Sequence, residues 1–173
     1  MAEGNGQVEL DPRALRDIGG RFATGVTVIT LRDGDQRHGM TANAFTSVSL
    51  RPPLVLYCIQ KSASVFEAEQ RTDTFAVNIL AEDQRAVSDF FARTGRGADG
   101  DSMGGFPYRD AGKSGAPLLE GSIAWLDCRV WARYEGGDHI IVVGEVLDMA
   151  LLQPEAPPLM FHGGAYRQVQ PRS

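Results

Sequence analysis

The segment "IAWLDCRVWARYEGGDHIIVVGEVLDMAL", residues 123–151, contains the two longest strand candidates of the chain. Its halves, Ile123–Tyr134 and His139–Leu151, are rich in the β-branched and aromatic residues that favour strands. Between them stands Glu135-Gly136-Gly137-Asp138, a short glycine-containing connector typical of a β-hairpin. The segment therefore predicts two long antiparallel strands joined as a hairpin.

Shorter strand candidates lie on both sides of this hairpin, at residues 25–31, 38–40, 54–60, 75–80, 159–161 and 166–169. Helical patterns occur at residues 12–18, from residue 64 onward, and at residues 82–93. Because these helices do not alternate regularly with the strands, a doubly wound parallel sheet is disfavoured. The pattern predicts a mostly β protein, an antiparallel β-barrel with peripheral helices.

Capping residues indicate where two of the helices begin. Asp11-Pro12 supplies an N-cap followed by proline at the first helical position. Ser64-Val65-Phe66-Glu67 fits a capping box. In the third helical segment, we expect one face to carry the apolar side chains Ala86, Val87, Phe90 and Phe91.

Two stretches lack such patterns. Residues 1–10 are polar and glycine-rich and predict a flexible N-terminal arm before a single domain, residues 11–173. Residues 94–117 contain seven glycines and two prolines, and predict a long loop without secondary structure. Such loops are often functional or mobile, and the sequence leaves open whether this one is a lid.

The composition is that of an ordinary folded protein with a single domain. The chain has 173 residues and a net charge of −5, which argues against binding to nucleic acid. Cys58 and Cys128 fall in apolar runs and are expected to be core residues in a reducing compartment, although a disulfide stays possible. No secretory signal or run of about 20 apolar residues is visible, so we expect a cytoplasmic protein.

Several familiar motifs are disfavoured by their context. The "GRGADG" of residues 95–100 has the spacing of a dinucleotide fingerprint, but it follows a helix and opens a glycine-rich loop. His38, His139 and His162 are too far apart in sequence to suggest a metal site. Residues 112–115 lack the second glycine of a nucleophile elbow.

The stretch "GMTANAFTSVSLRPP", residues 39–53, is unusual because it is polar but carries no charge before Arg51. Its short hydrogen-bonding side chains belong to Thr41, Asn43, Thr46, Ser47 and Ser49. An ordinary threonine-rich strand would explain part of this pattern. Neutral hydroxyls and an amide are also the groups that orient a flat heteroaromatic ring without burying a charge.

The stretch "CIQKSASVF", residues 58–66, places polar groups between a strand and a helix. Lys61, Ser62 and Ser64 supply a cation and two hydroxyls near a predicted helix N-terminus, an arrangement that suits a phosphate. An ordinary N-cap with a solvated lysine explains the same residues equally well. His139, which opens a strand directly after the hairpin turn, is either a surface residue or a contact for a ligand at the rim of the barrel.

Five segments, taken together and in order, resemble the flavin reductase family, the reductase components of two-component flavin monooxygenases. They are "RFATGVTVIT" (21–30), "GMTANAFTSVSLRPPLVLYCI" (39–59), "FAVNIL" (75–80), "GDHIIVVGEV" (137–146) and "PLMFHGGAYRQV" (158–169). The resemblance covers nearly the whole chain after residue 12. It implies an FMN-binding split barrel of antiparallel Greek-key type, usually a homodimer with flavin sites near the subunit interface.

The resemblance also implies an activity and a set of site residues. Such proteins use NADH or NADPH to reduce FMN or FAD, and the reduced flavin diffuses to a partner monooxygenase. The residues expected to contact the isoalloxazine and ribityl chain are Thr41, Ala42, Asn43, Ala44, Ser47, Val48 and Ser49. Those expected toward the phosphate are Cys58, Ile59, Lys61, Ser62, Ala63 and Ser64; His139 and Tyr166 are expected to border the nicotinamide, with His139 as the catalytic candidate.

One residue departs from the family pattern, because Ala44 stands where the family usually has serine. The preference between FMN and FAD is therefore harder to infer. Two other functions stay open: a split-barrel flavoprotein oxidase that keeps FMN tightly bound, and a flavin-binding barrel without enzymatic activity.

Overall fold

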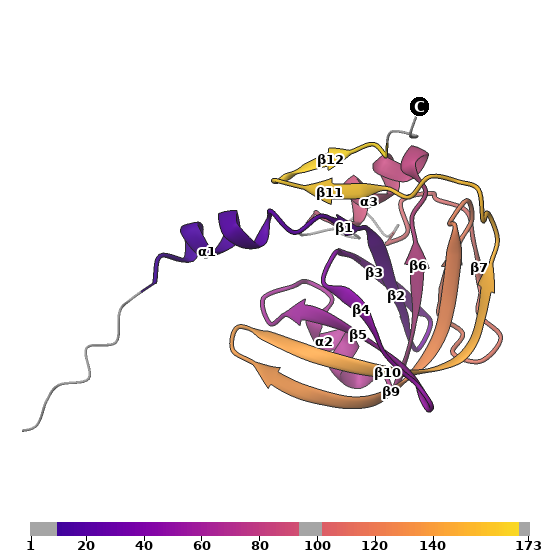
Figure 1. Cartoon of the computed structure of the whole chain (residues 1–173). Coiled ribbons are helices and arrows are strands. Elements are labelled where there is room, and N and C mark those ends of the chain that lie inside the picture. The colour runs from indigo at the N-terminus through magenta and orange to yellow at the C-terminus, as the bar shows by residue number, and fades with distance from the viewer. Residues whose placement is uncertain (1–9, 94–101, 170–173) are drawn as a thin grey trace, which may run out of the picture.

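A seven-stranded antiparallel sheet forms the body of the molecule (Figure 1). The computed structural model describes residues 10–93 and 102–169. The strands of the sheet run in the order β3 (Gln36–Ala42), β2 (Thr27–Asp33), β6 (Thr74–Ile79), β9 (Ala124–Gly136), β10 (His139–Leu151), β5 (Pro53–Gln60) and β4 (Phe45–Leu50). The sheet curls, and β3 comes into contact with β5 across it. The predicted mostly β, antiparallel architecture is confirmed.

The predicted hairpin forms as β9–β10, and the structure places it at the centre of this sheet. β9 continues to Gly136, so the turn is reduced to Gly137 and Asp138, with Gly137 at a φ of +77° that favours glycine. The register shifts between Val143 and Gly144, and again between Val146 and Asp148. Such bulges bend a strand and increase its twist, which allows β10 to follow the curled sheet.

The main apolar core lies inside the curl of the sheet. It includes Ile29, Tyr57, Phe75 and Val142, each at most 1% exposed. The rings of Tyr57 and Phe75 meet edge to face, with their centroids 5.0 Å apart. Phe75 also lies against Gly144 of β10, where an added Cβ would overlap the phenyl ring. Glycine is therefore required at this point of the central hairpin.

The remaining strands form two small sheets. β1 (Thr24–Gly25), β11 (Met160–His162) and β12 (Ala165–Arg167) form one, and β7 (Tyr108–Asp110) pairs with β8 (Pro117–Leu119) in the other. The prediction of a structureless loop over residues 94–117 was therefore wrong for its second part. Residues 94–101 lie outside the described residues. β7 and β8 have three residues each, which is too short for a periodic sequence pattern to indicate a strand.

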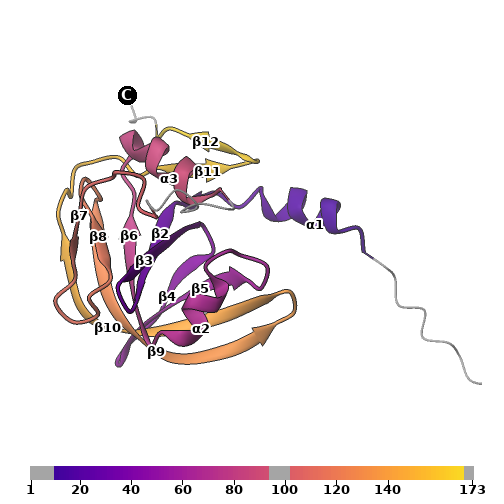
Figure 2. The same ribbon diagram turned by 180° about the vertical axis from the view of Figure 1, so that it is seen from behind.

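The first helix, α1 (Pro12–Gly19), forms where it was predicted, and the Asp11 carboxylate accepts a hydrogen bond from the Arg13 N–H at 2.9 Å. Figures 1 and 2 show from opposite sides that α1 stands clear of the sheet. None of its residues is buried, and the Leu15 and Ile18 side chains are 64% and 72% exposed. The helix therefore has an apolar face that the described part of this chain does not cover.

The second helix, α2 (Phe66–Arg71), begins later than the predicted capping box. Its N-cap is Val65, which makes no side-chain capping hydrogen bond, so the prediction of a Ser64 cap was wrong. A turn precedes the helix, in which the Phe66 N–H donates to the Ala63 carbonyl at 3.0 Å. The buried Glu69 of α2 forms an ion pair with Arg133 of β9 at 3.0 Å, which fixes the helix to the sheet.

The third helical segment consists of η1 (Glu82–Gln84) followed by α3 (Arg85–Phe91). Val87, Ser88 and Phe91 are the buried residues of α3, whereas Ala86 is exposed. The predicted apolar face was thus wrong in including Ala86, because the buried face of the helix turns toward Ser88. Phe91 packs on Gly39 of β3, where an added Cβ would lie 2.6 Å from the ring. This close approach seats the end of α3 against β3.

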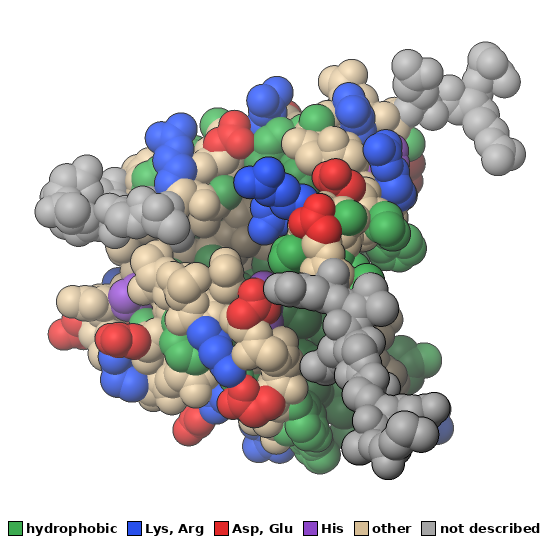
Figure 3. All heavy atoms as spheres, turned by 90° about the vertical axis from the view of Figure 1, so that its left-hand side faces the viewer, with side chains coloured by type: hydrophobic (Ala, Val, Ile, Leu, Met, Phe, Trp, Pro, Cys, Tyr) green, Lys and Arg blue, Asp and Glu red, His purple; other side chains and the backbone are tan. Residues whose placement is uncertain are grey.

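Exposed apolar side chains also gather on the sheet. Leu50 is 88% exposed, Met149 68% and Leu151 65%. Figure 3 shows hydrophobic side chains grouped on the lower part of the face from which α1 projects, whereas charges of both signs are spread over the rest. Exposed apolar areas of this kind often mark contacts with other molecules.

Both cysteines are free thiols, with Cys128 fully buried and Cys58 partly so. Among residues 10–93 and 102–169, no group of three or more histidine, cysteine or acidic side chains is arranged to hold a metal ion. No helix in the same ranges has the length and apolar character needed to cross a membrane.

The contact between Gly144 and Phe75 gives a test of the fold. We expect Gly144→Ala to lower the free energy of unfolding by about 1–3 kcal/mol, because the buried ring has to shift within a packed core. Urea denaturation measures this change. Gly25→Ala is the matched control, since nothing lies within 4 Å of the added Cβ in β1. Equal stability of the two variants would contradict the packing described here.

Candidate active site

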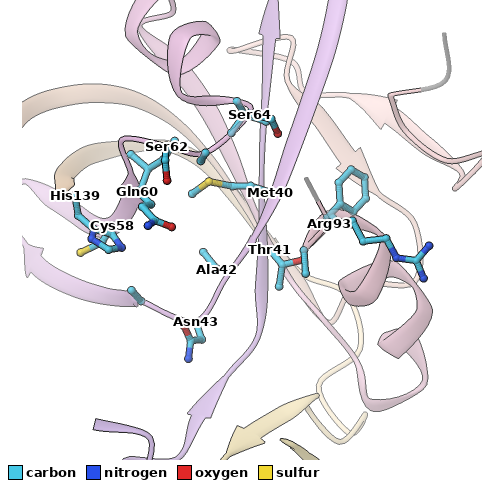
Figure 4. A pocket seen from close by; sticks show the side chains of 16 residues that line it. Met40, Thr41, Ala42, Asn43, Cys58, Gln60, Ser62, Ser64, Arg93 and His139 are labelled. Atoms are coloured by element: carbon cyan, nitrogen blue, oxygen red, sulfur yellow. The ribbon is translucent and has the colours of Figure 1, made fainter. Parts of the chain in front are cut away.

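A pocket of about 340 Å³ opens where the ends of β3 and β5, the start of β10 and the end of α3 meet (Figure 4). Ten of the residues predicted from the sequence line it: Thr41, Ala42, Asn43, Ala44, Cys58, Ile59, Ser62, Ala63, Ser64 and His139. They come from three segments that are far apart in the chain. The curl of the sheet therefore brings together most of the predicted site.

Five predicted residues lie outside the lining of this pocket. Ser47, Val48 and Ser49 continue along β4 at a register shift, and the Ser49 hydroxyl accepts a hydrogen bond from the Arg51 N–H at 3.2 Å. The Lys61 ammonium pairs with the Glu135 carboxylate at 2.6 Å. Tyr166 lines a different cavity. The predicted roles of these five residues stay predictions.

Six lining residues were missed by the sequence reasoning: Met40, Gln60, Val65, Phe91, Ala92 and Arg93. Met40 and Gln60 directly adjoin predicted residues on the same strands, so strand continuity was a usable signal. Phe91, Ala92 and Arg93 come from the end of α3, and no sequence pattern indicates that this helix meets β3. Figure 4 shows the Arg93 side chain extending away from Cys58, Gln60 and His139.

The wall of the pocket is polar but almost uncharged. Within the described part of the chain, Arg93 is the one lining residue with a permanent charge. The side chains of Asn43, Gln60, Ser62 and Ser64 have no hydrogen-bond partner among the described residues. These groups are therefore available to a ligand, and a neutral ligand with several acceptors and donors matches them best.

Thr41 differs from these residues because its hydroxyl proton is already used. Its Oγ1 donates to the backbone carbonyl of Ser88 in α3 at 2.7 Å. A carbonyl oxygen cannot donate, so the direction of this hydrogen bond is fixed. Toward a ligand in the pocket, the Thr41 hydroxyl can act only as an acceptor. It therefore selects for an N–H or O–H group at that point.

Tyr166 contacts the same residue of α3, Ser88, that accepts the hydrogen bond from Thr41. The Tyr166 and Ser88 hydroxyls are 2.8 Å apart, and the Arg85 guanidinium lies 5.1 Å from the centroid of the tyrosine ring. Partial burial, the largest influence, raises the pKa of Tyr166 above its ordinary value, so the phenol stays protonated. Tyr166 thus holds α3 in place rather than facing the pocket itself.

Cys58 contributes a neutral thiol to the wall. Desolvation raises the pKa of this thiol above its ordinary value. The thiolate is the reactive form of cysteine, so a raised pKa disfavours a nucleophilic role at neutral pH. Cys58 therefore contributes a small, polarisable thiol that can pack against a ring.

His139 is held at the rim by its neighbour in the hairpin turn. Its Nδ1 lies 2.7 Å from the Asp138 carboxylate. The hydrogen bond from His139, followed by the positive charge of that ring, lowers the pKa of Asp138 below its ordinary value. An ionised carboxylate only accepts, so Nδ1 carries a proton and Nε2 is the nitrogen left to contact a ligand.

Comparison with known proteins identifies the family of this chain. Residues 19–170 match the family model described as "Flavin reductase like domain". An NADH-dependent FAD reductase of Streptomyces globisporus is 41% identical over 94% of this chain and 90% of its own length. The reductase subunit HsaB of a flavin-dependent monooxygenase of Mycobacterium tuberculosis is 38% identical over 94% of this chain and 85% of its own.

Solved structures show the same fold. The NADH:FAD oxidoreductase SgcE6 of Streptomyces globisporus C-1027 superimposes with a TM-score of 0.87 at 40% identity, covering 94% of this chain and 97% of its own. A second structure of SgcE6, in complex with NAD and FAD fragments, gives a TM-score of 0.85 with 94% and 96% coverage. On the family match, the sequence identity and the shared fold, this chain belongs to the flavin reductase family.

Proposed function

We propose that this protein uses NADH to reduce a flavin in the pocket between β3, β5 and β10, and supplies the free reduced flavin to a monooxygenase. The observation that carries this proposal is the nearly uncharged pocket wall with unpartnered polar side chains at Asn43, Gln60, Ser62 and Ser64. An isoalloxazine ring has the carbonyls and ring nitrogens that such a wall can orient. Membership of the flavin reductase family and the names of the relatives support the same reaction.

When bound, the flavin supplies the redox chemistry by accepting a hydride from the reduced nicotinamide. The protein has to hold the two rings in contact and keep water away from them. Asn43, Ser62 and Ser64 orient the flavin by hydrogen bonds, whereas Ile59 and the neutral Cys58 give it an apolar surface. No side chain has to take up a proton during the transfer itself. His139 at the rim positions the nicotinamide or stabilises negative charge on the reduced flavin.

An absorbance assay at the nicotinamide band tests the proposed function. With NADH in excess, we expect turnover with added FMN, FAD or riboflavin, and a flavin that exchanges readily. A protein purified yellow, with stoichiometric flavin that does not dissociate, would instead indicate a tightly bound flavoprotein oxidase. Failure to oxidise NADH with any flavin would leave a binding protein without this activity and would contradict the proposal.

We also propose that the protein is a homodimer of FMN-binding split-barrel subunits. Its support is the apolar surface made by Val48, Leu50, Leu147, Met149 and Leu151, which are 37–88% exposed. Leu50 pairs with Pro53, and Leu147 lies two residues beyond Glu145, the partner of Leu54. These side chains therefore lie near one end of the sheet.

The two free thiols and the use of NADH are consistent with a cytoplasmic location.

If this apolar surface forms the dimer contact, the mass of the protein in solution should change when the surface is altered. We expect light scattering after gel filtration to give twice the 18.7 kDa mass of the chain. The double substitution Leu50→Lys and Met149→Lys should shift the protein toward the monomer, because it places charges in an apolar contact. Val169→Lys, which changes a 49% exposed residue outside this surface, should not. A monomeric wild-type protein at tens of micromolar would exclude the dimer.

The Thr41 hydroxyl donates its proton to the Ser88 carbonyl, so we expect it to affect the binding of oxidised and reduced flavin differently. The reduced isoalloxazine carries more N–H groups than the oxidised ring, so an obligate acceptor favours the reduced state. We expect Thr41→Val to weaken binding of reduced flavin about threefold to tenfold more than binding of oxidised flavin. Anaerobic titration with both forms measures the ratio. Thr46→Val, a change on β4 outside the pocket, is the control, and an unchanged ratio for Thr41→Val would refute the assignment.

The contact between Asp138 and His139 predicts a second effect on the reaction. Removing the ring with His139→Ala should lower kcat/KM for NADH by about tenfold or more, as expected for a residue in contact with the reacting groups. Asp138→Asn should give a smaller loss, because the ring remains but is less firmly oriented. Asp35→Asn, in the distant β2–β3 turn, removes a charge without touching the pocket. If His139→Ala left both kcat and the KM for NADH unchanged, this role would be wrong.

A further inference from the structure

Large apolar side chains are exposed mainly in two separate parts of the molecule. One is the segment of residues 10–22, which contains α1 and which we call the α1 arm. The other is a group on β4 and β10, which we call the β4–β10 surface. The α1 arm exposes Leu10, Leu15, Ile18 and Phe22 by 64–78%, and the β4–β10 surface consists of Val48, Leu50, Leu147, Met149 and Leu151.

The α1 arm extends away from the sheet that carries the β4–β10 surface. None of the α1 residues is buried, and Figures 1 and 2 show the helix standing clear of the sheet. The arm is joined to the body at its base, where the Gly163 N–H donates to the Gly20 carbonyl at 2.8 Å and Thr24 pairs with Phe161. The helix is therefore fixed at one end, and its apolar side chains face outward.

A helix as short as α1 needs a surface to pack on. It has eight residues, from Pro12 to Gly19, and isolated helices shorter than about 12–15 residues are marginal in water. The N-cap Asp11 and a proline at the first position favour its start but supply no packing. Most helical stability in proteins comes from burying an apolar face. The persistence of α1 therefore points to a contact with another molecule.

The charges of the two surfaces are complementary. The α1 arm contains three arginines and two aspartates, a charge of +1, in a chain whose net charge is −5. None of its arginines, Arg13, Arg16 and Arg21, forms an ion pair with a described residue. Asp148 lies between Leu147 and Met149, and its carboxylate accepts a hydrogen bond from the Met149 N–H but forms no ion pair within the described ranges.

We propose that the α1 arm of each subunit packs on the β4–β10 surface of a second copy of this chain, so that two chains exchange arms. This inference rests on the homodimer of the proposed function and names the contact that holds it together. A second copy fits better than a different protein, because every chain carries one arm and one surface. A two-fold pair then covers both arms and both surfaces and leaves none open.

The area of such a contact is that of a stable interface. Burying one large apolar side chain removes about 100 Å² from water, so the four side chains of each arm remove about 400 Å². Two arms, with an equal area on the surfaces they cover, bury about 1,600 Å² in total, the usual size of a specific interface. The exchange alone therefore suffices for a stable dimer.

The exchange also bears on the active site. Gly19, Gly20 and Phe22, at the base of the arm, line a cavity of about 460 Å³. This cavity shares Asn43 with the pocket between β3, β5 and β10. An arm seated on the second copy holds its base in place, and the dimer contact thereby fixes one wall beside the pocket.

Two double variants, each altered on one side of the contact, test the exchange. Leu15→Glu with Ile18→Glu charges the arm, and Leu50→Lys with Met149→Lys charges the β4–β10 surface. At tens of micromolar, we expect light scattering to give each variant alone the 18.7 kDa mass of one chain. Mixed in equal amounts, the two should form a dimer of twice that mass. In the mixed pair, an intact arm meets an intact surface, and at the other contact glutamates face lysines.

Gln168→Glu with Val169→Glu is the matched control, because it adds two negative charges at exposed residues outside both surfaces and should stay dimeric. Circular dichroism should be close to that of the wild type for all variants, since the altered arm residues are not buried. A dimeric Leu15→Glu, Ile18→Glu variant would overturn the exchange, as would a mixture that stays monomeric. If the arm variant is dimeric and the surface variant monomeric, the homodimer stands without exchanged arms. A monomeric wild-type protein would overturn both.

Discussion

The backbone pairing between β9 and β10 sets the position of the other strands in the main sheet. These two 13-residue strands are the longest of the described chain, and each carries a further strand on its outer edge, β6 on β9 and β5 on β10. Long antiparallel strands twist, and the two register shifts in this pair add to the bend. The curled sheet that results can enclose a core and still bring β3 close to β5.

The pocket between β3, β5 and β10 is a consequence of that curl. β3 and β5 end near one another, and the β9–β10 turn delivers His139 to the same place. The remaining wall comes from α3, which reaches β3 only because Gly39 leaves room for the Phe91 ring. A hydrogen bond from Thr41 to the Ser88 carbonyl then links the helix to the strand at the pocket itself. The packing that positions α3 and the hydrogen-bonding capacity of the Thr41 hydroxyl in the pocket therefore depend on each other.

Charged side chains are distributed unevenly between the pocket and its surroundings. The pocket between β3, β5 and β10 presents neutral polar groups, which orient a ring without the desolvation cost of a buried ion. Charged side chains lie nearby, at Arg16, Asp17 and Arg21 around a neighbouring cavity that shares Asn43 with this pocket, where solvent reduces that cost.

The sequence by itself predicted six of the seven strands of the main sheet, the β9–β10 hairpin and the first helix, because strand propensity and turn residues act locally; β4 was not among its strand candidates. Ten of the residues that line the pocket were predicted from the resemblance to a family and from the polar pattern of residues 39–66. The sequence also identified the family, because short motifs survive in order along the chain. Only the tertiary structure decided that α3 forms a wall of the pocket, that Lys61 pairs with Glu135, and that Tyr166 lies behind Ser88. These facts depend on contacts between segments up to 78 residues apart, and such contacts leave no periodic trace in the sequence.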